Sequence, residues 1–573
     1  MYIAKVPNRN SPPTYLLRES YRENGRVKNR TLANISELPI QQIQLLRRVL
    51  KGEELVPADG AFSITRTVPH GHVRAVLDMF ACLDLPSLIS SQRSRERDLV
   101  LAMIAQRLLY PGSKLATTRL WKNTTLAEEL DVVDADVDEL YHALDWLLGR
   151  QNRIENKLAR RHLRNDDLVH YDVSSSSYTG ATCVLARLGK NRDGRRDLPC
   201  IVYGVMTDDE GRPISVDVYP GNTGDPSTVP DQMQKLKKRF HLERVVAVGD
   251  RGMLTQTQID KLRTRPGLGW LSALRSSGIR KLIDKGRLER SLFDEQNLAE
   301  IRSPDFPGER LVACYNPLLD ERRRRKREAL LTATEAAFQR IAREIGRRTK
   351  KPLEKAEIGL KVGRILNKYK VGKHFDLTIE DSELKWERKQ QAIDKETGLD
   401  GIYVIRTSES AERLSAENAV RGYKRLAEVE QAFRSLKSLE LLVRPIHHRL
   451  ADRVAAHIFV CLLAYYVLWH LKRAWSPLLF ADEHLREHQA ERDPVAPAKP
   501  AAEVTVKKSE RRTPEGNDLQ SFRTLLAALG TQCRDTCEFG EGASVIQITK
   551  LTDPTPLQSE ALRHLVDYCS QQP

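Results

Sequence analysis

Three acidic residues, Asp172, Asp250 and Glu430, are of a type that can hold metal ions and act on a phosphodiester. Carboxylate oxygens without an accompanying Cys or His set are the ligands that Mg²⁺ and Mn²⁺ prefer. Two such ions can stabilise the attacking and the leaving oxygen of an in-line displacement at phosphorus. Any long chain offers many Asp and Glu residues, so this interpretation depends on the elements that carry the three.

Asp172 and Asp250 each belong to a short apolar run. The run 168–173 carries Asp172 and is followed by four serines, and the run 244–250 ends in Asp250. Apolar runs of this length, bounded by small polar residues, are typical of buried strands that deliver a side chain to the edge of a sheet. The alternative for Asp172 is a strand residue that only begins a turn with the serines.

Other apolar and amphipathic segments surround these two runs. They predict strands at 200–206, 213–219 and 268–274, and helices at 227–239 and 255–263. The resulting order is three strands, a helix, a strand, a helix and a strand. The first three strands suit a meander, and the later ones, which alternate with helices, should pair in parallel.

Glu430 lies in a segment that predicts one helix over 415–439. Tyr423 and Lys437 each stand seven residues from Glu430, which places all three within about 20° of one another around the helix axis. Arg434 follows Glu430 by four residues and lies beside them. Apolar residues between these positions predict that the helix is partly buried, so the charged face lies near a packed surface. The alternative is an exposed helix on which Glu430 and Arg434 form an ordinary ion pair.

The segment before this helix interrupts the strand and helix order. Residues 290–316 and 373–407 are rich in strand signals, and a long charged helix is predicted between them, over 319–369. That helix contains six consecutive basic residues, Arg322 to Arg327. Such a run is either a solvated helix face or a contact with a DNA backbone.

The beginning of the chain predicts a β-hairpin. Two strand-like runs, 15–21 and 27–35, flank Asn24-Gly25, a dipeptide that strongly favours a hairpin turn. Basic side chains along the hairpin suit either contact with phosphates or a solvated sheet edge protected by charge. From residue 72 to 163 the periodicity becomes helical.

Composition restricts the class of protein. The chain has 573 residues, too many for one core, so two or more domains are expected. Its formal charge is +16 and its pI about 9.4. A surplus of Lys and Arg of this size favours a polyanionic partner such as nucleic acid, although a basic protein without such a partner remains the alternative.

The eight cysteines are scattered and form no Cys-x-x-Cys pair. Reduced thiols in a cytosolic protein are therefore expected, rather than a disulfide framework or a zinc site. The apolar segment 455–470 is short for a membrane span and contains two histidines, which favours a buried core helix. Residues 489–517, rich in Pro, Ala, Lys and Arg, predict a flexible linker.

These residues together resemble a known family, the DDE transposases of bacterial insertion sequences, in the branch marked by a Tyr-Arg-Glu-Lys signature (the insertion sequence four type). The signature spaces Tyr, two residues, Arg, three residues, Glu, six residues and Lys. Tyr423, Glu430 and Lys437 match it. The Arg position holds Leu426, with Arg425 one place early, and Arg434 is the other basic residue able to take that role.

The resemblance implies an α/β fold: a ribonuclease H-like catalytic core with a strand-rich insertion, preceded by a helical module and an N-terminal β-hairpin. The implied divisions are an N-terminal hairpin arm at 1–68, a helical, DNA-binding module at 69–165, a catalytic domain at 166–475 with its insertion at about 285–410, and a linker with a small C-terminal region at 476–573.

The resemblance also implies chemistry and partners. Asp172, Asp250 and Glu430 would be catalytic and would bind two Mg²⁺ or Mn²⁺ ions, while Tyr423, Arg434 and Lys437 would contact DNA. The reaction would cut transposon ends and join them to target DNA by hydrolysis and strand transfer. Terminal inverted repeats and target DNA would be the partners of a homodimer in the cytoplasm, associated with the nucleoid and without a membrane.

Two other functions are compatible with the same residues. One is a related metal-dependent nuclease that cuts DNA without joining it. The other is a DNA-binding protein whose site is inactive, against which the intact set of Asp172, Asp250 and Glu430 argues.

Overall fold

The computed structural model describes residues 1–573 except 10, 54–61, 295, 349, 496–498, 540–545 and 573. The chain divides into two compact units. The first contains residues Met1–Val68 and Cys533–Thr552, and the second contains Pro69–Gln532 and Asp553–Pro573. The first unit therefore combines segments from both halves of the chain, whereas the sequence predicts an arm at 1–68 and a separate C-terminal region.

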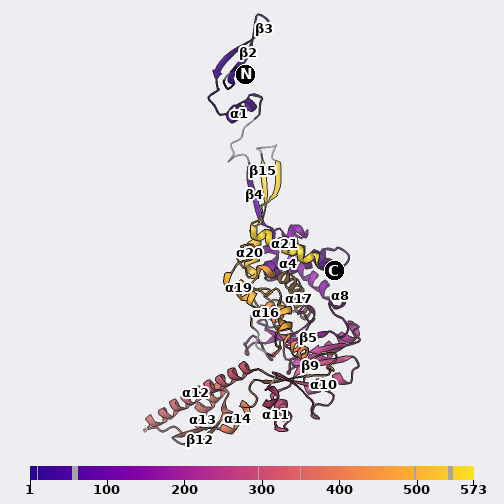
Figure 1. The fold of residues 1–573 in the computed structure, drawn as a ribbon, viewed down its shortest axis with the longest axis vertical. Helices are drawn as coiled ribbons and strands as arrows, with labels where there is room; N and C mark the ends of the chain where they lie inside the picture. Colours follow the sequence, from indigo (N-terminus) through magenta and orange to yellow (C-terminus); the bar gives the residue numbers. More distant parts are fainter. Residues whose placement is uncertain are drawn as a thin grey trace. The chain divides into compact units, whose positions relative to one another are not determined.

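The first unit begins with a three-stranded antiparallel sheet (Figure 1). Its strands are β1 (Tyr2–Val6), β2 (Thr14–Glu23) and β3 (Arg26–Asn34), and helix α1 (Ile40–Leu50) follows. Asn24 and Gly25 both adopt positive φ angles, 54° and 77°, which is the backbone that a tight hairpin turn between β2 and β3 requires. The hairpin predicted from Asn24-Gly25 is confirmed.

A second sheet in this unit joins strands that are far apart in the sequence. It has the order β16–β15–β4, with β4 at Phe62–Pro69, β15 at Cys533–Phe539 and β16 at Ile546–Leu551. Phe62 of β4 stacks on Phe539 of β15 with ring centroids 5.5 Å apart. The C-terminal strand is predicted at 544–548, of which the first two residues lie outside the described residues.

The second unit is organised around a mixed sheet of eight strands, in the order β10–β11–β14–β9–β8–β5–β6–β7. Five of them carry the predicted strands: β5 (Leu168–Ser177), β6 (Cys200–Thr207), β7 (Pro213–Pro220), β8 (Val245–Val248) and β9 (Leu268–Ala273). Strands β5, β6 and β7 form an antiparallel meander, and β5, β8 and β9 pair in parallel. Both pairings were predicted from the strand and helix order and are confirmed.

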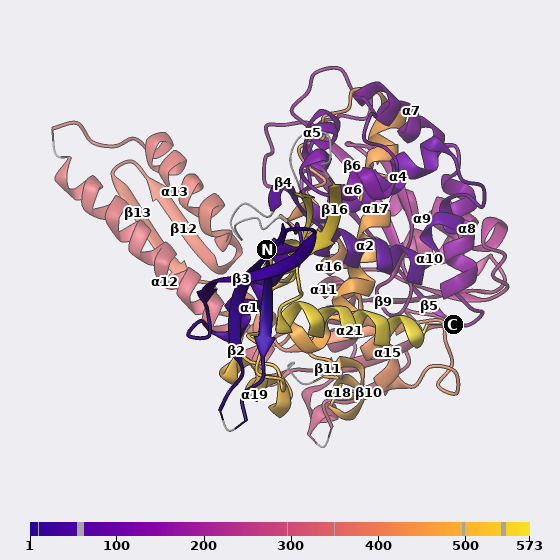
Figure 2. The same cartoon turned by 90° about the horizontal axis from the view of Figure 1, so that it is seen from above.

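The strand-rich insertion contributes to the same sheet. Strands β10 (Leu298–Ile301), β11 (Arg310–Tyr315) and β14 (Ile402–Thr407) extend it antiparallel beyond β9. The remainder of the insertion packs around its own core. Figure 2 shows this part at the left, away from the strands of the large sheet. That part contains α12 (Pro317–Arg347), α13 (Lys355–Tyr369), β12 (Phe375–Glu380), β13 (Glu383–Arg388) and α14 (Gln390–Thr397).

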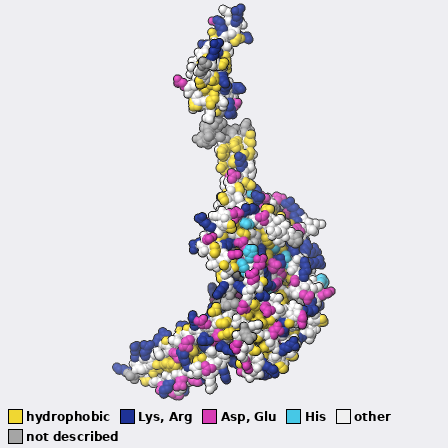
Figure 3. Space-filling view, viewed as in Figure 1, with side chains coloured by type: hydrophobic (Ala, Val, Ile, Leu, Met, Phe, Trp, Pro, Cys, Tyr) yellow, Lys and Arg dark blue, Asp and Glu magenta, His cyan; other side chains and the backbone are white. Residues whose placement is uncertain are grey.

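The basic run Arg322–Arg327 lies on α12. Arg324 pairs with Asp320 and Arg325 with Glu321, four residues earlier on the same helix, while Arg327 is buried against Asp400. These ion pairs occupy half of the run. On the face shown in Figure 3, Lys and Arg side chains are interspersed with Asp and Glu rather than collected in one patch.

Helices cover the sheet of the second unit and pack against it in three hydrophobic clusters, of which the largest is the main core. The N-terminal group comprises α2 (Gly71–Cys82), α3 (Leu85–Ile89), α4 (Arg95–Leu109), α5 (Lys114–Leu120), α6 (Leu126–Glu129), α7 (Val137–Leu148) and α8 (Gln151–His162). The sheet connections carry α9 (Asp225–Gln234), α10 (Gln256–Arg263) and α11 (Ser276–Asp284). The later helices are α15 (Ala416–Lys424), α16 (Leu426–Lys437), α17 (Ala451–Ala474), α18 (Leu485–Glu491), α19 (Ala502–Glu510), α20 (Phe522–Gly530) and α21 (Pro556–Ser570).

Helix α17 is the centre of that core. It is long and apolar enough to cross a membrane, but 89% of its most apolar window is buried inside the protein. It packs against α2, α4, α7 and β7. This burial agrees with the core helix predicted from the two histidines within the apolar segment.

One cysteine pair corrects the expectation that all eight thiols are reduced. Cys82 at the end of α2 and Cys569 in α21 form a disulfide, with Cα atoms 5.4 Å apart. The two residues are 487 positions apart in the sequence, and they meet because α21 packs against α2. No local spacing of cysteines in the sequence indicates this disulfide. The six other cysteines are not disulfide-bonded.

Candidate active site

The three carboxylates Asp172, Asp250 and Glu430 line one open pocket in the second unit, with a volume of about 700 Å³. Arg434 and Lys437 line the same pocket. Tyr423 does not; it lines a neighbouring pocket with Arg251. Of the six residues singled out in the sequence, the structure thus brings five to one pocket and leaves Tyr423 beside it.

Strand pairing brings Asp172 and Asp250 to the same level of the sheet. Strands β5 and β8 are parallel neighbours, and His170 pairs with Val248. Asp172 and Asp250 each stand two residues beyond that pair, at the carboxyl end of β8. Because β5 and β8 are parallel and in register at this pair, Asp172 within β5 and Asp250 just after β8 lie at the same height along neighbouring strands.

Backbone groups orient both aspartates. The Oδ1 atom of Asp250 accepts hydrogen bonds from the N–H groups of Gly252 and Met253, at 3.0 and 2.7 Å. The Oδ1 atom of Asp172 accepts one from Val173 N–H at 2.7 Å. Asp250 is exposed, whereas Asp172 is partly buried.

Glu430 reaches the pocket from α16, which packs across β5 and β6. Val429, Phe433 and Leu436 face the core, and the Phe433 ring lies 5.9 Å from that of Tyr203 on β6. Glu430 is left on the exposed side of the helix. A helix with an apolar stripe on the sheet must present the intervening residues away from it.

The single helix predicted over 415–439 is wrong in one respect: it is interrupted at Arg425, which caps both α15 and α16. Tyr423 therefore lies on α15 and Glu430 on α16, so their seven-residue spacing no longer places them on one helix face. The His170 imidazole donates to the Gly422 carbonyl at 2.8 Å, which ties α15 to β5 next to Tyr423. Glu430 and Lys437 do share α16.

Burial and neighbouring carboxylates shift the ionisation of two groups at this site. Burial, with a further contribution from Asp250, raises the pKa of Asp172 to about 7. Burial also raises the pKa of Tyr423 to about 12, and the charges of Asp250 and Glu430 add to that shift. Tyr423 therefore lies within the field of both carboxylates, although it does not line their pocket. A cation bound among these groups would be favoured electrostatically.

The donor set fits a hard divalent cation in kind, since all three groups offer carboxylate oxygen. In the part of the chain that the structure describes, no group of three or more His, Cys, Asp or Glu residues is close enough to ligate one ion as it stands. The shared pocket of Asp172, Asp250 and Glu430 is the observation that favours a positively charged occupant.

The opposite side of the pocket is basic. Lys437 donates through Nζ to the Ser175 carbonyl at 2.6 Å and pairs with Asp193 at 3.1 Å. Arg444 pairs with the same Asp193 carboxylate at 2.5 Å, and Asp193 also accepts a hydrogen bond from Ser177 N–H. Burial lowers the pKa of Lys437. Asp193 thus holds two cations at the rim of the pocket.

Arg434 and Arg425 differ sharply in their surroundings. The Arg434 side chain is exposed at the pocket and forms no ion pair or hydrogen bond within the described residues. Arg425 does not line the pocket, because its guanidinium is bound to Asp209. Arg434 is therefore the arginine available to an anion in this pocket.

Sequence reasoning missed a group of charged residues on two loops. Lys190 and Arg192 come from the connection between β5 and β6, and both pair with Asp225 at the start of α9, at 3.1 and 2.6 Å. Asp193 belongs to the same connection. The available signal was the density of charge and glycine in 187–196, directly after the Asp172 strand. Nothing in the sequence indicated that this loop folds back over the strand.

Two family models match the chain. Residues 181–467 match the transposase DDE domain, and residues 3–58 match the N-terminal domain of IS1634 family transposases. The chain belongs to the DDE transposases. The DDE match includes Asp250, Glu430 and the three candidate DNA-binding residues, and it begins nine residues after Asp172. No curated protein matches this transposase.

The match at the N-terminus supports a transposase of an insertion sequence but names the IS1634 family. The insertion sequence four branch, predicted from the Tyr-Arg-Glu-Lys spacing, is not confirmed. The departure at the Arg position, where Leu426 stands, agrees with a different branch.

Proposed function

We propose that this transposase cuts the ends of its transposon and joins the resulting 3′-hydroxyl groups to target DNA, with Asp172, Asp250 and Glu430 as its catalytic carboxylates. The observation that carries the proposal is that β5, the end of β8 and α16 direct these side chains into one pocket. The strand order β7–β6–β5–β8–β9, with β5, β8 and β9 parallel, supports a ribonuclease H-like core.

The three carboxylates would hold two divalent ions, Mg²⁺ or Mn²⁺. When bound, the ions would activate the attacking oxygen and stabilise the leaving oxygen of the phosphodiester. The protein's own contribution is positional: the N–H groups of Gly252 and Met253 fix Asp250, and the sheet fixes Asp172 beside it. Such preorganisation is what separates a metal site from three nearby acids.

The basic side of the pocket would hold the DNA backbone. Arg434 is exposed and unpaired within the described residues, so it can form a bidentate contact with a phosphate. Lys437, held by Asp193 and Ser175, would act as a point charge. Tyr423, which lies on α15, would contact a phosphate of the DNA. The DNA partners are the terminal inverted repeats and the target, and action on two ends favours a homodimer.

A strand-transfer assay with paired terminal inverted repeats, target DNA and Mg²⁺ tests the function. We expect metal-dependent cutting followed by joined products. The removal of the divalent ion with EDTA should abolish both steps and leave end binding measurable. Cutting without any joined product would contradict the proposal and favour a nuclease.

Arg434→Gln should weaken DNA binding and flatten its dependence on salt. Loss of one phosphate contact reduces the slope of log K against log salt by about 0.9. Arg425→Gln is the matched control on the neighbouring helix boundary, because Arg425 binds Asp209 and does not line the pocket. Fluorescence anisotropy across a salt series measures the slope. Equal slopes for both variants would remove Arg434 from the DNA contact.

A further inference from the structure

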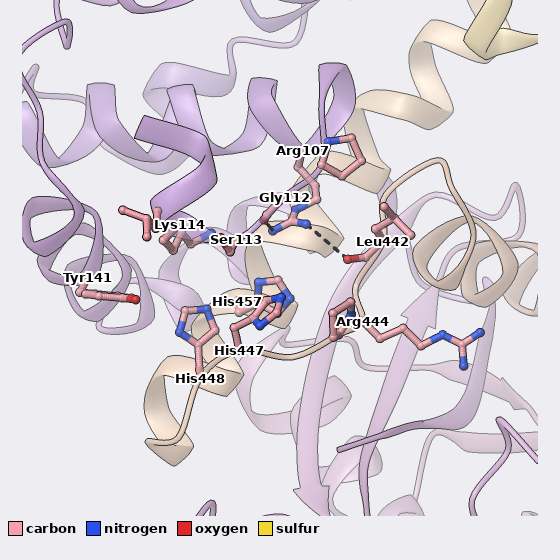
Figure 4. A pocket seen from close by; sticks show the side chains of 13 residues that line it. Arg107, Gly112, Ser113, Lys114, Tyr141, Leu442, Arg444, His447, His448 and His457 are labelled. Atoms are coloured by element: carbon pink, nitrogen blue, oxygen red, sulfur yellow. Dashed lines mark hydrogen bonds between the residues drawn. The ribbon is translucent and has the colours of Figure 1, made fainter. Parts of the chain in front are cut away.

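A second pocket adjoins the candidate active site and has an unusual lining. Its volume is about 350 Å³, and Arg444 lines both pockets. One wall comes from the end of α4 and the start of α5, and the other from the segment between α16 and α17 (Figure 4). All of its lining residues are described, and none of them is an Asp or Glu. Two cations, Arg107 and Lys114, are buried there without a carboxylate.

Lys114 is the decisive residue. It is only 4% exposed, yet its ammonium group forms no ion pair and no hydrogen bond within the described part of the chain. Burial, reinforced by the charge of Arg107, lowers the pKa of Lys114 to about 7. A buried ammonium without a partner costs free energy, and proteins that only need a packed core replace it or pair it. This lysine is therefore poised for a partner that arrives from outside.

Arg107 is held in place beside it by main-chain carbonyls. Its guanidinium donates to Leu442 at 3.3 Å and to Gly112 at 3.1 Å, and Figure 4 shows the bond to Leu442. These contacts fix the orientation of the side chain without neutralising its charge. A fixed guanidinium next to an ammonium is a preorganised anion site.

Histidines complete the wall. The rings of His448 and His457 are 5.2 Å apart, and His457 donates through Nε2 to the Val443 carbonyl at 2.9 Å. Burial, with the charges of Lys114 and Arg107, lowers the pKa of His448 to about 3. In Figure 4 the guanidinium of Arg444 extends away from these rings, in keeping with its ion pair to Asp193 in the active-site pocket.

We propose that this pocket binds a phosphate group through Lys114 and Arg107. The group is either a phosphate of the DNA strand that also occupies the active site, which rests on the proposed function, or a free phosphate anion, which does not. The pocket adjoins the candidate active site, since Arg444 lines both, and this favours the DNA strand. The volume suits a phosphate with part of its sugar.

The test compares Lys114→Gln with Lys122→Gln in the full-length chain. Lys122 is exposed, eight residues later, and lines neither pocket. Inorganic phosphate is titrated against chloride at equal ionic strength, and the melting temperature is followed. We expect phosphate to stabilise the wild type and Lys122→Gln, and to stabilise Lys114→Gln less. General salt effects act on all three alike. Without phosphate, Lys114→Gln should melt no lower than the wild type, because it removes an unpaired buried charge.

A fluorescent 30-base-pair duplex supplies the second arm. Lys114→Gln should reduce the slope of log K against log salt by about 0.9 relative to Lys122→Gln. If only the phosphate response changes, the pocket is a site for free phosphate and its role on DNA is overturned. If both variants respond alike in both arms, the proposal is overturned. Lys114→Met, which also removes the charge at similar size, replaces Lys114→Gln with the same expected results if that variant does not fold. None of these readouts requires DNA cutting. Failure of this proposal can therefore be distinguished from failure of the proposed catalytic role of the carboxylates.

Discussion

Glu430→Gln should reduce the rate of end cutting by roughly 10³-fold or more while end binding persists. The substitution retains size and removes the charge that would help to hold the divalent ions. Ions of this kind contribute several kcal/mol of transition-state stabilisation, and each 1.36 kcal/mol is a factor of about ten in rate. Single-turnover cutting of labelled transposon ends in Mg²⁺ measures the effect. Asp172→Asn and Asp250→Asn should behave in the same way.

Glu428→Gln is the matched control. Glu428 lies on the same helix, two residues earlier, but it lines two other pockets, beside Arg425 and Arg486. It should cut at a rate within a few fold of the wild type. A near wild-type rate in Glu430→Gln would remove Glu430 from the catalytic set. The Asp172 variant matters equally, because Asp172 precedes the segment that matches the DDE family model.

Gly221→Ala should destabilise the second unit strongly, with a loss of about 3 kcal/mol or more. A Cβ atom at this position would lie 1.9 Å from the Cys200 carbonyl oxygen and 2.4 Å from that of Arg187. Both are backbone atoms and cannot rotate away. The Gly221 N–H also donates to Leu185 at 2.9 Å, so the loop after β7 is bound to the connection between β5 and β6. Displacement would shift the loop that carries Arg192 and Asp193.

Gly224→Ala provides the comparison, since a Cβ there meets nothing within 4 Å and the φ angle is an ordinary −77°. It should cost about 1 kcal/mol or less, because Gly224 is the N-cap of α9 and alanine is a poorer cap than glycine. Chemical denaturation of both variants, followed by tryptophan fluorescence, measures the difference. Similar midpoints for the two variants would show that the loop can relax without cost.

The part of the sheet that carries the candidate site was predictable because its signals are local. The apolar run that contains Asp172 and the run that ends in Asp250 identify strands, and alternation with helices makes β5, β8 and β9 parallel neighbours. Parallel pairing then dictates that both carboxylates reach one edge. The amphipathic pattern around Glu430 similarly places the glutamate on the face of α16 that is turned from the core.

The remaining parts depend on distant contacts that leave no local pattern. The helix breaks at Arg425 although the helical pattern of the sequence continues through that residue. Arg425 pairs there with Asp209, which is more than 200 residues earlier in the chain. The meeting of Lys190 and Arg192 with Asp225 requires the path of two loops. The disulfide between Cys82 and Cys569 and the strand partners of β4 likewise join opposite ends of the chain.

The β16–β15–β4 sheet has a consequence for how the polypeptide is made. Strand β4 leaves the ribosome long before β15 and β16 are synthesised. During most of translation β4, with its exposed Phe62 and Ile64, therefore has no strand to pair with. An apolar strand edge in a nascent chain is prone to associate with other chains. Premature termination anywhere before Cys533 would leave that edge permanently open, so incomplete chains of this transposase should be the aggregating species in the cell.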